Sequence, residues 1–341
     1  MQTDSLCIMT TRAESAQYAI AEMQKYDTQI RPMRELALGV RLMTLPGGWA
    51  RFVTDAHPLI FVRHIFPVQY STRCDAELNV DALLNALDIP VCGDGTTSFA
   101  VQTRGGVPLA WCADIEAALQ NCGFEKNVKH PEWVVSLFTH KNEAGELVLY
   151  AGASTVAANR SRWNGGAAHY ANDGVLSRAA HKLTEALEAF GLAEKAMASN
   201  ALDLGAAPGG WTQVLLDKGA QVTAVDPGVM DARLANHPHM HYVCATAQRF
   251  FAEAIKSKNA TRYDLIVNDM KMDMYESARI MVDAAFLLAS DGYAIMTFKL
   301  KPGQGFAKIK KALDILVPGY RVVGVRQLFH NRDEVTVCLT R

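Results

Sequence analysis

The pattern of apolar and polar residues divides the chain into two regions that differ in how predicted helices and strands follow each other. In the first region, short apolar runs and segments of helical spacing follow each other irregularly, which is typical of a mixed α+β fold. The pattern predicts strands at 6–10, 39–44, 98–103, 133–140 and 146–151 and within 57–66, and helices at 13–26, 80–87 and 109–122. This region contains no catalytic motif, and we interpret it as a binding or positioning module.

From about residue 175 onward, helical segments alternate with fully apolar strands, as in a parallel α/β sheet covered on both faces. The pattern predicts strands at 202–204, 221–225, 263–267, 293–298 and 334–339, and helices at 176–190 and 211–218. Between Ala158 and Gly174 the composition changes to Asn, Arg, Ser, Gly and Ala. This change favours a domain boundary, with an ordinary surface loop as the alternative.

Composition adds that the chain is a packed protein. Its 341 residues are 50% hydrophobic and 20% charged, which suits about two domains and excludes disorder over most of the length. No uninterrupted apolar run reaches the roughly 18 to 20 residues of a membrane span, and the first residues lack the features of a secretory signal. We therefore expect a cytoplasmic protein that is not associated with a membrane.

Charge is distributed unevenly along the chain. The first 160 residues hold 13 basic and 17 acidic residues, a net charge of −4, whereas the rest hold 21 and 18, a net charge of +3. Neither region is strongly basic, so charge alone does not indicate a nucleic-acid partner. Evidence for an RNA substrate has to come from the chemistry of a site.

Cysteine and histidine give no metal signature. The seven cysteines are scattered and form no C-x-x-C pair, which favours reduced thiols and excludes a zinc ribbon. His237, His239 and His241 are the single metal-like cluster, and Pro238 among them predicts a loop leading into a strand. Tetrahedral sites usually draw their ligands from two separated segments, so we predict no metal site.

The segment 201–212, ALDLGAAPGGWT, is the strongest sign of a cofactor. A short buried strand leads into the glycine-rich turn 205–210, and a helix begins at Trp211. Glycine lets a ligand approach the backbone, and a helix start presents free N–H groups. Asp226 ends the next strand about 20 residues later, where a carboxylate would bind a ribose diol.

Nicotinamide cofactors and S-adenosylmethionine both use such an arrangement. The dinucleotide fingerprint G-x-G-x-x-G brings a pyrophosphate to the helix N-terminus. Here the pattern is D-x-G-x-x-P-G-G, with Pro208 in the third position after Gly205 and no glycine two residues after it. A cofactor without a pyrophosphate, S-adenosylmethionine, therefore fits better.

Four ionisable residues accompany this loop. Asp269 and Lys299 follow the apolar strands 263–267 and 293–298, Lys182 lies in the predicted helix 176–190, and Glu334 opens the last strand. Ligands bind at the carboxyl edge of a parallel sheet, so Asp269 and Lys299 should flank the reactive end of the cofactor. A ribose hydroxyl is a poor acid, and its methylation needs a base.

A lysine can be that base only when it is neutral. A neighbouring ammonium group and partial burial would lower its pKa, while carboxylates would orient the ammonium groups. Methylation of an adenine amino group usually shows Asn/Asp-Pro-Pro-aromatic where this chain has 268–271, NDMK. Cytosine carbon-5 methylation needs a cysteine nucleophile, and neither Cys244 nor Cys338 lies at the substrate end of these strands. Hydroxyl methylation is favoured.

Several of these segments resemble one known family. They are SRAAHKL at 177–183, DLGAAPGGWT at 203–212, ND at 268–269, FK at 298–299 and RDEV at 332–335. They are similar to the Lys-Asp-Lys-Glu ribose 2'-O-methyltransferases, which have a Rossmann-like fold. The segment 326–337, RQLFHNRDEVTV, is closer to the bacterial branch that methylates a cytidine ribose in large-subunit (23S) ribosomal RNA. The segment 58–63, PLIFVR, and the order of elements resemble the N-terminal half of that branch.

The resemblance implies a domain plan, a reaction and a substrate. Residues 1–55 would be a ferredoxin-like segment, 56–160 a THUMP-type RNA-binding domain, and 161–341 a Rossmann-like methyltransferase domain that uses S-adenosylmethionine. The partner would be ribosomal RNA or a precursor of the large ribosomal subunit. The alternative is an RNA-binding or ribosome-assembly protein that retains the fold without activity, and an NAD-dependent oxidoreductase is a more distant one.

The resemblance also implies the roles of individual residues. Lys299 would be the base, with Lys182, Asp269 and Glu334 shaping the site. The residues expected at the cofactor are Ser177, Gly205, Ala207, Pro208, Gly209, Gly210, Trp211, Asp226, Thr246 and Asp269. Where the family often has an acidic residue near the adenine, this chain has Ala245 and Thr246, and Thr246 can supply a hydroxyl.

Overall fold

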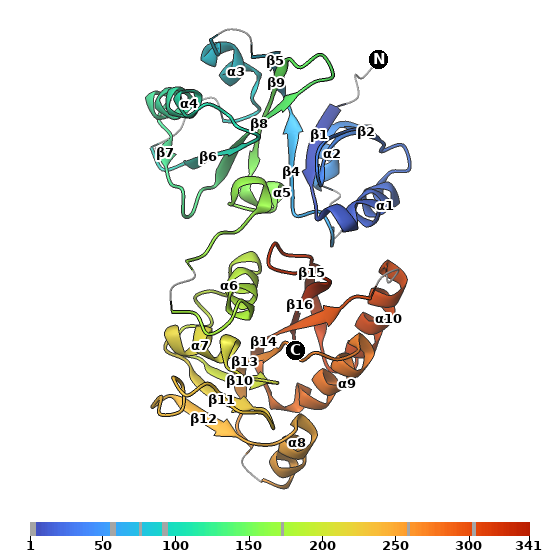
Figure 1. The fold of residues 1–341 in the computed structure, drawn as a ribbon, viewed down its shortest axis with the longest axis vertical. Coiled ribbons are helices and arrows are strands. Elements are labelled where there is room, and N and C mark those ends of the chain that lie inside the picture. The colour runs from blue at the N-terminus through green and yellow to red at the C-terminus, as the bar shows by residue number, and fades with distance from the viewer. Residues whose placement is uncertain are drawn as a thin grey trace. The chain divides into compact units, whose positions relative to one another are not determined.

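The computed structural model describes residues 5–54, 59–74, 77–90, 95–171, 174–257, 260–301 and 305–341. Its contacts divide the chain into two compact units, Met1–His169 and Tyr170–Arg341 (Figure 1). Two segments singled out in the sequence, 57–66 and 58–63, begin with His57 and Pro58, and these two residues lie outside the described ranges. No helix within the described ranges has the length and apolar character needed to cross a membrane.

The N-terminal unit begins with a four-stranded antiparallel sheet of order β2-β3-β1-β4. The main elements follow each other as β-α-β-β-α-β, the order of a ferredoxin-like fold. They are β1 (Ser5–Thr10), η1 (Ala13–Ser15), α1 (Ala16–Tyr26), β2 (Pro32–Ala37), β3 (Val40–Leu45), α2 (Gly48–Thr54) and β4 (His64–Val68). The fourth strand of this sheet thus lies beyond residue 55, where the sequence division ended the segment.

A second sheet of order β5-β9-β8-β6-β7 follows in the same unit. Its elements are β5 (Tyr70–Arg73), α3 (Val80–Ala86), β6 (Ser98–Arg104), α4 (Leu109–Asn121), β7 (Glu125–Lys126), β8 (Trp133–Lys141), β9 (Leu147–Thr155), α5 (Val156–Asn159) and η2 (Asn164–Gly166). Phe138 of β8 packs in one core cluster with Ile8 and Phe66, so the two sheets share buried surface. A Cβ on Gly152 would lie 1.7 Å from the Pro67 carbonyl oxygen, so β9 can approach β4 there only through glycine.

The segment just after residue 160 packs with the N-terminal unit. The Thr10 hydroxyl donates to the Gly165 carbonyl at 2.8 Å, and the Gln102 amide donates to the Ser161 carbonyl at 2.8 Å. The contact boundary accordingly falls after His169. The division into three domains, with limits at 55 and 160, stays a prediction.

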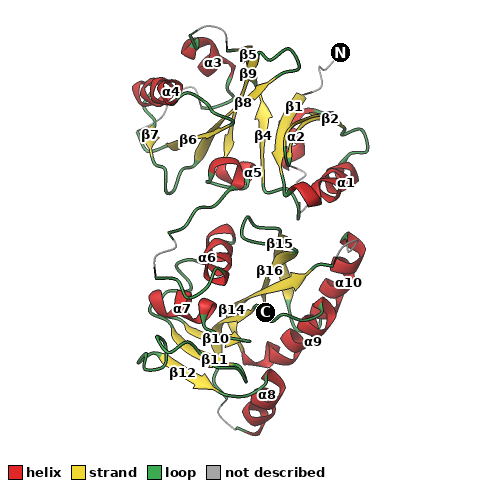
Figure 2. Ribbon diagram, viewed as in Figure 1, coloured by secondary structure: helices red, strands yellow, loops and turns green. Residues whose placement is uncertain are grey.

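The C-terminal unit is built on a seven-stranded sheet of order β12-β11-β10-β13-β14-β16-β15 (Figure 2). Strands β10 to β14 are parallel, and β16 and β15 are antiparallel to their neighbours. Helices α6 and α7 lie on one face of the sheet, and α8, α9 and α10 lie on the other (Figure 1). This is the Rossmann-like α/β architecture expected from the sequence, and the prediction is confirmed.

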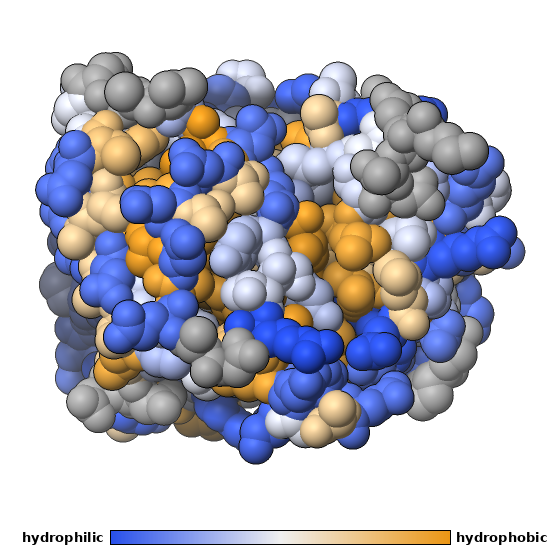
Figure 3. Space-filling model, turned by 90° about the horizontal axis from the view of Figure 1, so that it is seen from above, coloured by the Kyte–Doolittle hydropathy of each residue, from blue (hydrophilic) through white to orange (hydrophobic). Residues whose placement is uncertain are grey.

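The elements of this unit are α6 (Ala179–Ala189), β10 (Asn200–Leu204), α7 (Gly210–Asp217), β11 (Gln221–Val225), β12 (Met240–Val243), α8 (Ala247–Lys256), β13 (Tyr263–Asn268), α9 (Met274–Ala284), η3 (Ala285–Leu287), β14 (Leu288–Lys299), α10 (Phe306–Leu316), β15 (Arg321–Arg326) and β16 (Glu334–Thr340). Leu183 and Leu187 of α6 pack with Leu215 of α7 against Val267 and Ile295 of the sheet, all fully buried. Apolar strands thus fix the sheet, while polar side chains collect where the parallel strands end. Seen from above the view of Figure 1, the surface of the molecule shows apolar areas interrupted by hydrophilic side chains (Figure 3).

Candidate active site

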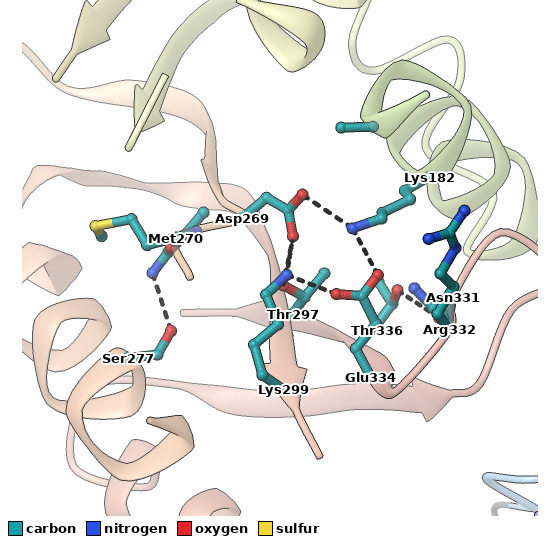
Figure 4. A network of polar contacts seen from close by, with 12 residues as sticks. Lys182, Asp269, Met270, Ser277, Thr297, Lys299, Asn331, Arg332, Glu334 and Thr336 are labelled. Atoms are coloured by element: carbon teal, nitrogen blue, oxygen red, sulfur yellow. Dashed lines mark hydrogen bonds and ion pairs between the residues drawn. The ribbon is translucent and has the colours of Figure 1, made fainter. Parts of the chain in front are cut away.

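Two lysines and two carboxylates meet where β13 and β14 end. The antiparallel register of β14 and β16 places Lys299 directly opposite Glu334. Asp269 follows β13, and Lys182 reaches the same place from α6 (Figure 4). Glu334 lies 2.6 Å from Lys182 Nζ and 2.5 Å from Lys299 Nζ, and Asp269 lies 3.2 Å from Lys182 Nζ and also pairs with Lys299. The structure therefore brings all four predicted residues into one ring, which we call the Lys-Asp ring.

Positive and negative groups alternate around the Lys-Asp ring. Each carboxylate bridges both lysines, so the ring is formally neutral when all four groups are ionised. Glu334 is the most buried member, with 6% of its side chain exposed, whereas Lys299 is the most accessible with 24%. Lys182 and Asp269 lie between these values. Of the two lysines, Lys299 is the one that offers more surface to a substrate.

Attraction between opposite charges outweighs burial in setting the pKa of both Lys182 and Asp269. Burial lowers the pKa of Lys182, but Asp269 and Glu334 outweigh burial, and the net pKa lies above the ordinary lysine value. Burial likewise raises the pKa of Asp269, and the two lysines outweigh it, so the net pKa is lowered. Two carboxylates within ion-pairing distance therefore favour the charged form of Lys182.

Thr297 completes the ring and was missed in the sequence analysis. Its hydroxyl donates to Asp269 Oδ1 at 2.7 Å and accepts from Lys299 Nζ at 2.8 Å (Figure 4). Thr297 lies two residues before Lys299 on β14, so both side chains point to the same face of the sheet. That spacing is the sequence signal that could have identified it. Thr297 orients the carboxylate and the ammonium group at once.

The residues expected at the cofactor gather at the same edge of the sheet. Gly205 to Trp211 form the turn after β10 and the start of α7, Asp226 follows β11, and Thr246 lies shortly after β12. These three strands and β13 are neighbours in the sheet order. The carboxyl ends of neighbouring parallel strands form the ligand-binding edge of such folds.

Asp226 has the geometry of a ribose-binding residue. Its carboxylate accepts the backbone N–H groups of Ala207 at 3.1 Å and Gly228 at 2.6 Å. The Tyr242 hydroxyl lies 3.0 Å from the Asp226 carbonyl oxygen and also contacts that of Gly228, which fixes this loop. An ionised carboxylate has about four acceptor positions, so two remain for the hydroxyl groups of a ribose. The residues present therefore fit the ribose of S-adenosylmethionine.

The glycine turn is shaped by side chains of the protein itself. A Cβ on Gly205 would lie 2.2 Å from Met270 Cγ, and a Cβ on Gly210 would lie 2.2 Å from the Ser177 hydroxyl oxygen. At these two positions glycine makes room for Met270 and Ser177, in addition to any ligand. The predicted residue Ser177 is thereby brought against the start of α7.

Two of the predicted cofactor residues have structural contacts of their own. The Trp211 indole is 3% exposed and donates to the Ala179 carbonyl at 2.8 Å, which ties α7 to α6. Thr246 is the N-cap of α8, and its hydroxyl oxygen accepts the Arg249 N–H at 3.3 Å. The capping bond leaves the hydroxyl hydrogen of Thr246 available as a donor. A role of either residue in cofactor binding stays a prediction.

The three alternating histidines lie at β12, the edge strand of the sheet. His237 and His239 lie in the loop before β12, with ring centroids 5.8 Å apart, and His241 is the second residue of that strand. Within the described ranges, no group of three His, Cys, Asp or Glu residues has the geometry of a metal site.

Comparison with known proteins gives matches over both parts of the chain. Residues 175–325 match the FtsJ-like methyltransferase family, a range that includes Lys182, Asp269 and Lys299 and ends before Glu334. The chain is 28% identical over 298 residues to ribosomal RNA large subunit methyltransferase M of Pseudoalteromonas atlantica, covering 82% of this chain and 81% of that protein. It is 26% identical over 325 residues to the protein of the same name from Pseudomonas entomophila, covering 87% and 85%.

Among solved structures, the chain is similar to the fibrillarin pre-rRNA processing protein of Methanococcus jannaschii, with a TM-score of 0.36 and 19% identity. That similarity covers 42% of this chain and 67% of the other.

Proposed function

We propose that this chain, whose residues 175–325 form an FtsJ-like, S-adenosylmethionine-dependent methyltransferase domain, methylates a ribose 2'-hydroxyl of large-subunit ribosomal RNA. The observation that carries the proposal is the Lys-Asp ring at the carboxyl edge of the sheet, the same edge that holds Asp226 with its ribose-binding geometry. The two relatives that match over most of the chain are named as methyltransferases of large-subunit ribosomal RNA. This substrate also favours a cytoplasmic location.

The ring supplies what a ribose hydroxyl needs in order to react. S-adenosylmethionine, when bound, supplies a methyl group activated by a positively charged sulfur. Lys299 is the base that removes the 2'-hydroxyl proton, because it is the more exposed of the two lysines. Asp269, Thr297 and Glu334 hold its Nζ in one position. Positioned general bases typically contribute about 10² to 10⁴-fold to the rate.

Lys299 can accept that proton only when its own amino group is neutral. The fully ionised ring is neutral, so losing one proton leaves it with a charge of −1. Because the positively charged sulfur of bound S-adenosylmethionine would offset this negative charge, the ring would give up a proton more readily with the cofactor present. Lys182 keeps its proton, because Asp269 and Glu334 outweigh burial and raise its pKa.

Two exposed cations beside the ring suit an RNA substrate. Lys271 lies two residues after Asp269, and Arg332 lies two residues before Glu334, on the loop that leads into β16 (Figure 4). Within the described residues, neither has a carboxylate within ion-pairing distance. The ring is neutral, and these cations supply the attraction for phosphates on either side of the target ribose. The N-terminal unit would bind the surrounding RNA.

The rival interpretation is an inactive RNA-binding protein that retains the fold. This interpretation predicts that at least one member of the ring is lost or displaced. All four are present with alternating charges, and three of the ion pairs join lysine Nζ to carboxylate oxygen at 2.5 to 3.2 Å. The geometry thus supports an enzyme.

The test is methyl transfer to large-subunit ribosomal RNA from a strain lacking this gene. Labelled S-adenosylmethionine reports the rate, and resistance of the labelled position to alkaline cleavage identifies a 2'-O-methyl group. Lys299→Ala should lower kcat by at least about 10²-fold and leave cofactor and RNA affinity within a few fold. Lys308→Ala, which removes an exposed lysine of α10, is the matched control.

Two results would contradict the proposal. Near-normal turnover by Lys299→Ala would remove Lys299 from the mechanism. Absence of turnover by the unmodified protein on both naked RNA and precursor particles, with cofactor bound, would favour the inactive RNA-binding protein.

A further inference from the structure

We propose that Glu185 is a positioning residue that fixes the distance between α6, which carries Lys182, and β16, which carries Glu334. The inference rests on the proposed function, because it concerns the same reaction. Glu185 lies outside the Lys-Asp ring and acts through the loop 327–333, which connects β15 to β16.

The carboxylate of Glu185 binds two consecutive backbone groups of this loop. Its Oε1 accepts the Phe329 N–H at 2.7 Å, and its Oε2 accepts the His330 N–H at 2.9 Å. The His330 ring nitrogen Nδ1 lies 2.8 Å from the same Oε2. The Glu185 side chain is 10% exposed, and hydrogen bonds to a buried carboxylate are stronger than neutral ones. Glu185 therefore holds the start of the loop firmly on α6.

The other end of the loop is tied to β16. The buried Asn331 side chain accepts the Leu328 N–H at 2.8 Å and the Thr336 hydroxyl at 3.0 Å. Thr336 lies two residues after Glu334, so both side chains are on the same face of the strand (Figure 4). The loop is thus a short connection held at both ends, from α6 through Glu185 and Asn331 to β16.

Aromatic rings enclose the Glu185 contact. Tyr170 stacks on His181 with ring centroids 5.7 Å apart, and its ring lies 5.4 Å from that of His330. The Tyr170 hydroxyl donates to Glu188 at 3.0 Å, one turn after Glu185 on α6. This packing keeps the imidazole of His330 against the carboxylate.

This connection matters because Lys182 and Glu185 are one turn apart on the same rigid helix. The 2.6 Å ion pair between Lys182 and Glu334 spans the same two elements as the loop contact, but a lysine side chain is flexible and does not by itself set the orientation of its partner. Misplacing a catalytic group by about 1 Å can cost about 10²-fold in rate. Glu185 supplies the second point of attachment that fixes Glu334, and through it Lys299.

The experiment compares Glu185→Ala and Glu185→Gln with Glu194→Ala, which removes an exposed carboxylate shortly after the same helix, as the matched control. Rates are normalised to the number of S-adenosylmethionine-binding sites and measured well below the melting temperature. We expect kcat of Glu185→Ala to fall about 30 to 100-fold, with KM for RNA and cofactor Kd within about twofold. Glu185→Gln keeps one acceptor for the loop and should recover a large part of kcat, and Glu194→Ala should match the unmodified protein.

Three outcomes would overturn the inference. One is an unchanged kcat per binding site, with or without a lower melting temperature, which a purely structural role predicts. Another is an effect confined to KM or cofactor Kd, and the third is a Glu185→Gln variant as impaired as Glu185→Ala. If Glu185→Ala does not fold, Glu185→Gln alone decides: it should lower kcat about 3 to 10-fold at unchanged KM, and an unchanged kcat refutes the inference. An inactive Lys299→Ala in the same assay shows that the proposed function stands whatever Glu185 does.

Discussion

Asp269 offers the sharpest test of how the Lys-Asp ring is held together. Asp269→Asn keeps the size of the side chain and removes its charge. In the unmodified protein, the Asp269 carboxylate pairs with the ammonium groups of Lys182 and Lys299 and accepts a hydrogen bond from the Thr297 hydroxyl. The Asp269 side chain is 17% exposed. In the variant, the amide NH₂ would face an ammonium group, and two lysines would share the single carboxylate of Glu334.

The size of the effect follows from these contacts. A hydrogen bond to a charged group contributes about 1.5 to 3 kcal/mol, and breaking a buried ion pair by removing one partner costs about 3 to 5 kcal/mol. Glu334 still pairs with both lysines, which places the loss at the lower end. We expect the free energy of unfolding at pH 7 to fall by about 3 kcal/mol.

The loss should depend on pH in a defined direction. Burial raises the pKa of Asp269 and the two lysines lower it, with a net value below that of an ordinary Asp. A carboxyl group with a lowered folded-state pKa stabilises the protein above its unfolded pKa of about 3.9, and this contribution is lost as the pH falls further. The difference between the unmodified protein and Asp269→Asn should be constant from about pH 5 to 7 and shrink below about pH 4.

Denaturant unfolding of both proteins across this pH range is the assay. Asp217→Asn is the control, because Asp217 is exposed on α7 and its substitution should change the free energy of unfolding by no more than about 0.5 kcal/mol. A difference below about 1 kcal/mol at pH 7, or one that grows as the pH falls, would refute the view that Asp269 is held as a charged partner of both lysines.

Two further predictions concern binding. Asp226→Ala should weaken the binding of S-adenosylmethionine by about 10 to 150-fold, which corresponds to the roughly 1.5 to 3 kcal/mol of charged hydrogen bonds to the ribose. An unchanged Kd in titration calorimetry would contradict the assignment. The double variant Lys271→Ala and Arg332→Ala should reduce the slope of log K for RNA against log salt by about 1 to 1.5 at unchanged cofactor affinity, since each phosphate contact on a single strand contributes about 0.7. An unchanged slope would show that these cations do not contact phosphates.

Local patterns carried the prediction of the cofactor loop. The apolar run before Gly205, the glycine turn and the position of Asp226 depend on residues close in sequence, and the structure shows strand, turn and helix there. The helix carrying Lys182 was also predicted, although it begins at Ala179 and not at Leu176. Strand β2 was missed, because Pro32 to Ala37 is mostly exposed and lacks an apolar alternation.

Pairs of residues far apart in sequence were harder to predict. In the sequence, Thr297 is one more residue of an apolar strand. Its contact with Asp269 forms only because β13 and β14 pair as neighbours in the sheet. Glu185 reads as an ordinary charged residue of an amphipathic helix, yet it is buried against a loop 144 residues away. No local signal distinguishes such a carboxylate from a solvated one.

The sequence by itself determined the parallel α/β units and the residue types at the ends of their strands, because apolar runs and glycine turns act through local backbone preferences and burial. It did not determine the strand order. An apolar strand such as β16 could pair at several places, and only the tertiary structure inserts it antiparallel between β14 and β15. That insertion places Glu334 opposite Lys299, and the packing of α6 on the sheet brings Lys182 to both carboxylates. The site depends on these non-local pairings, whose free energy comes from burial of the whole sheet and not from any one segment.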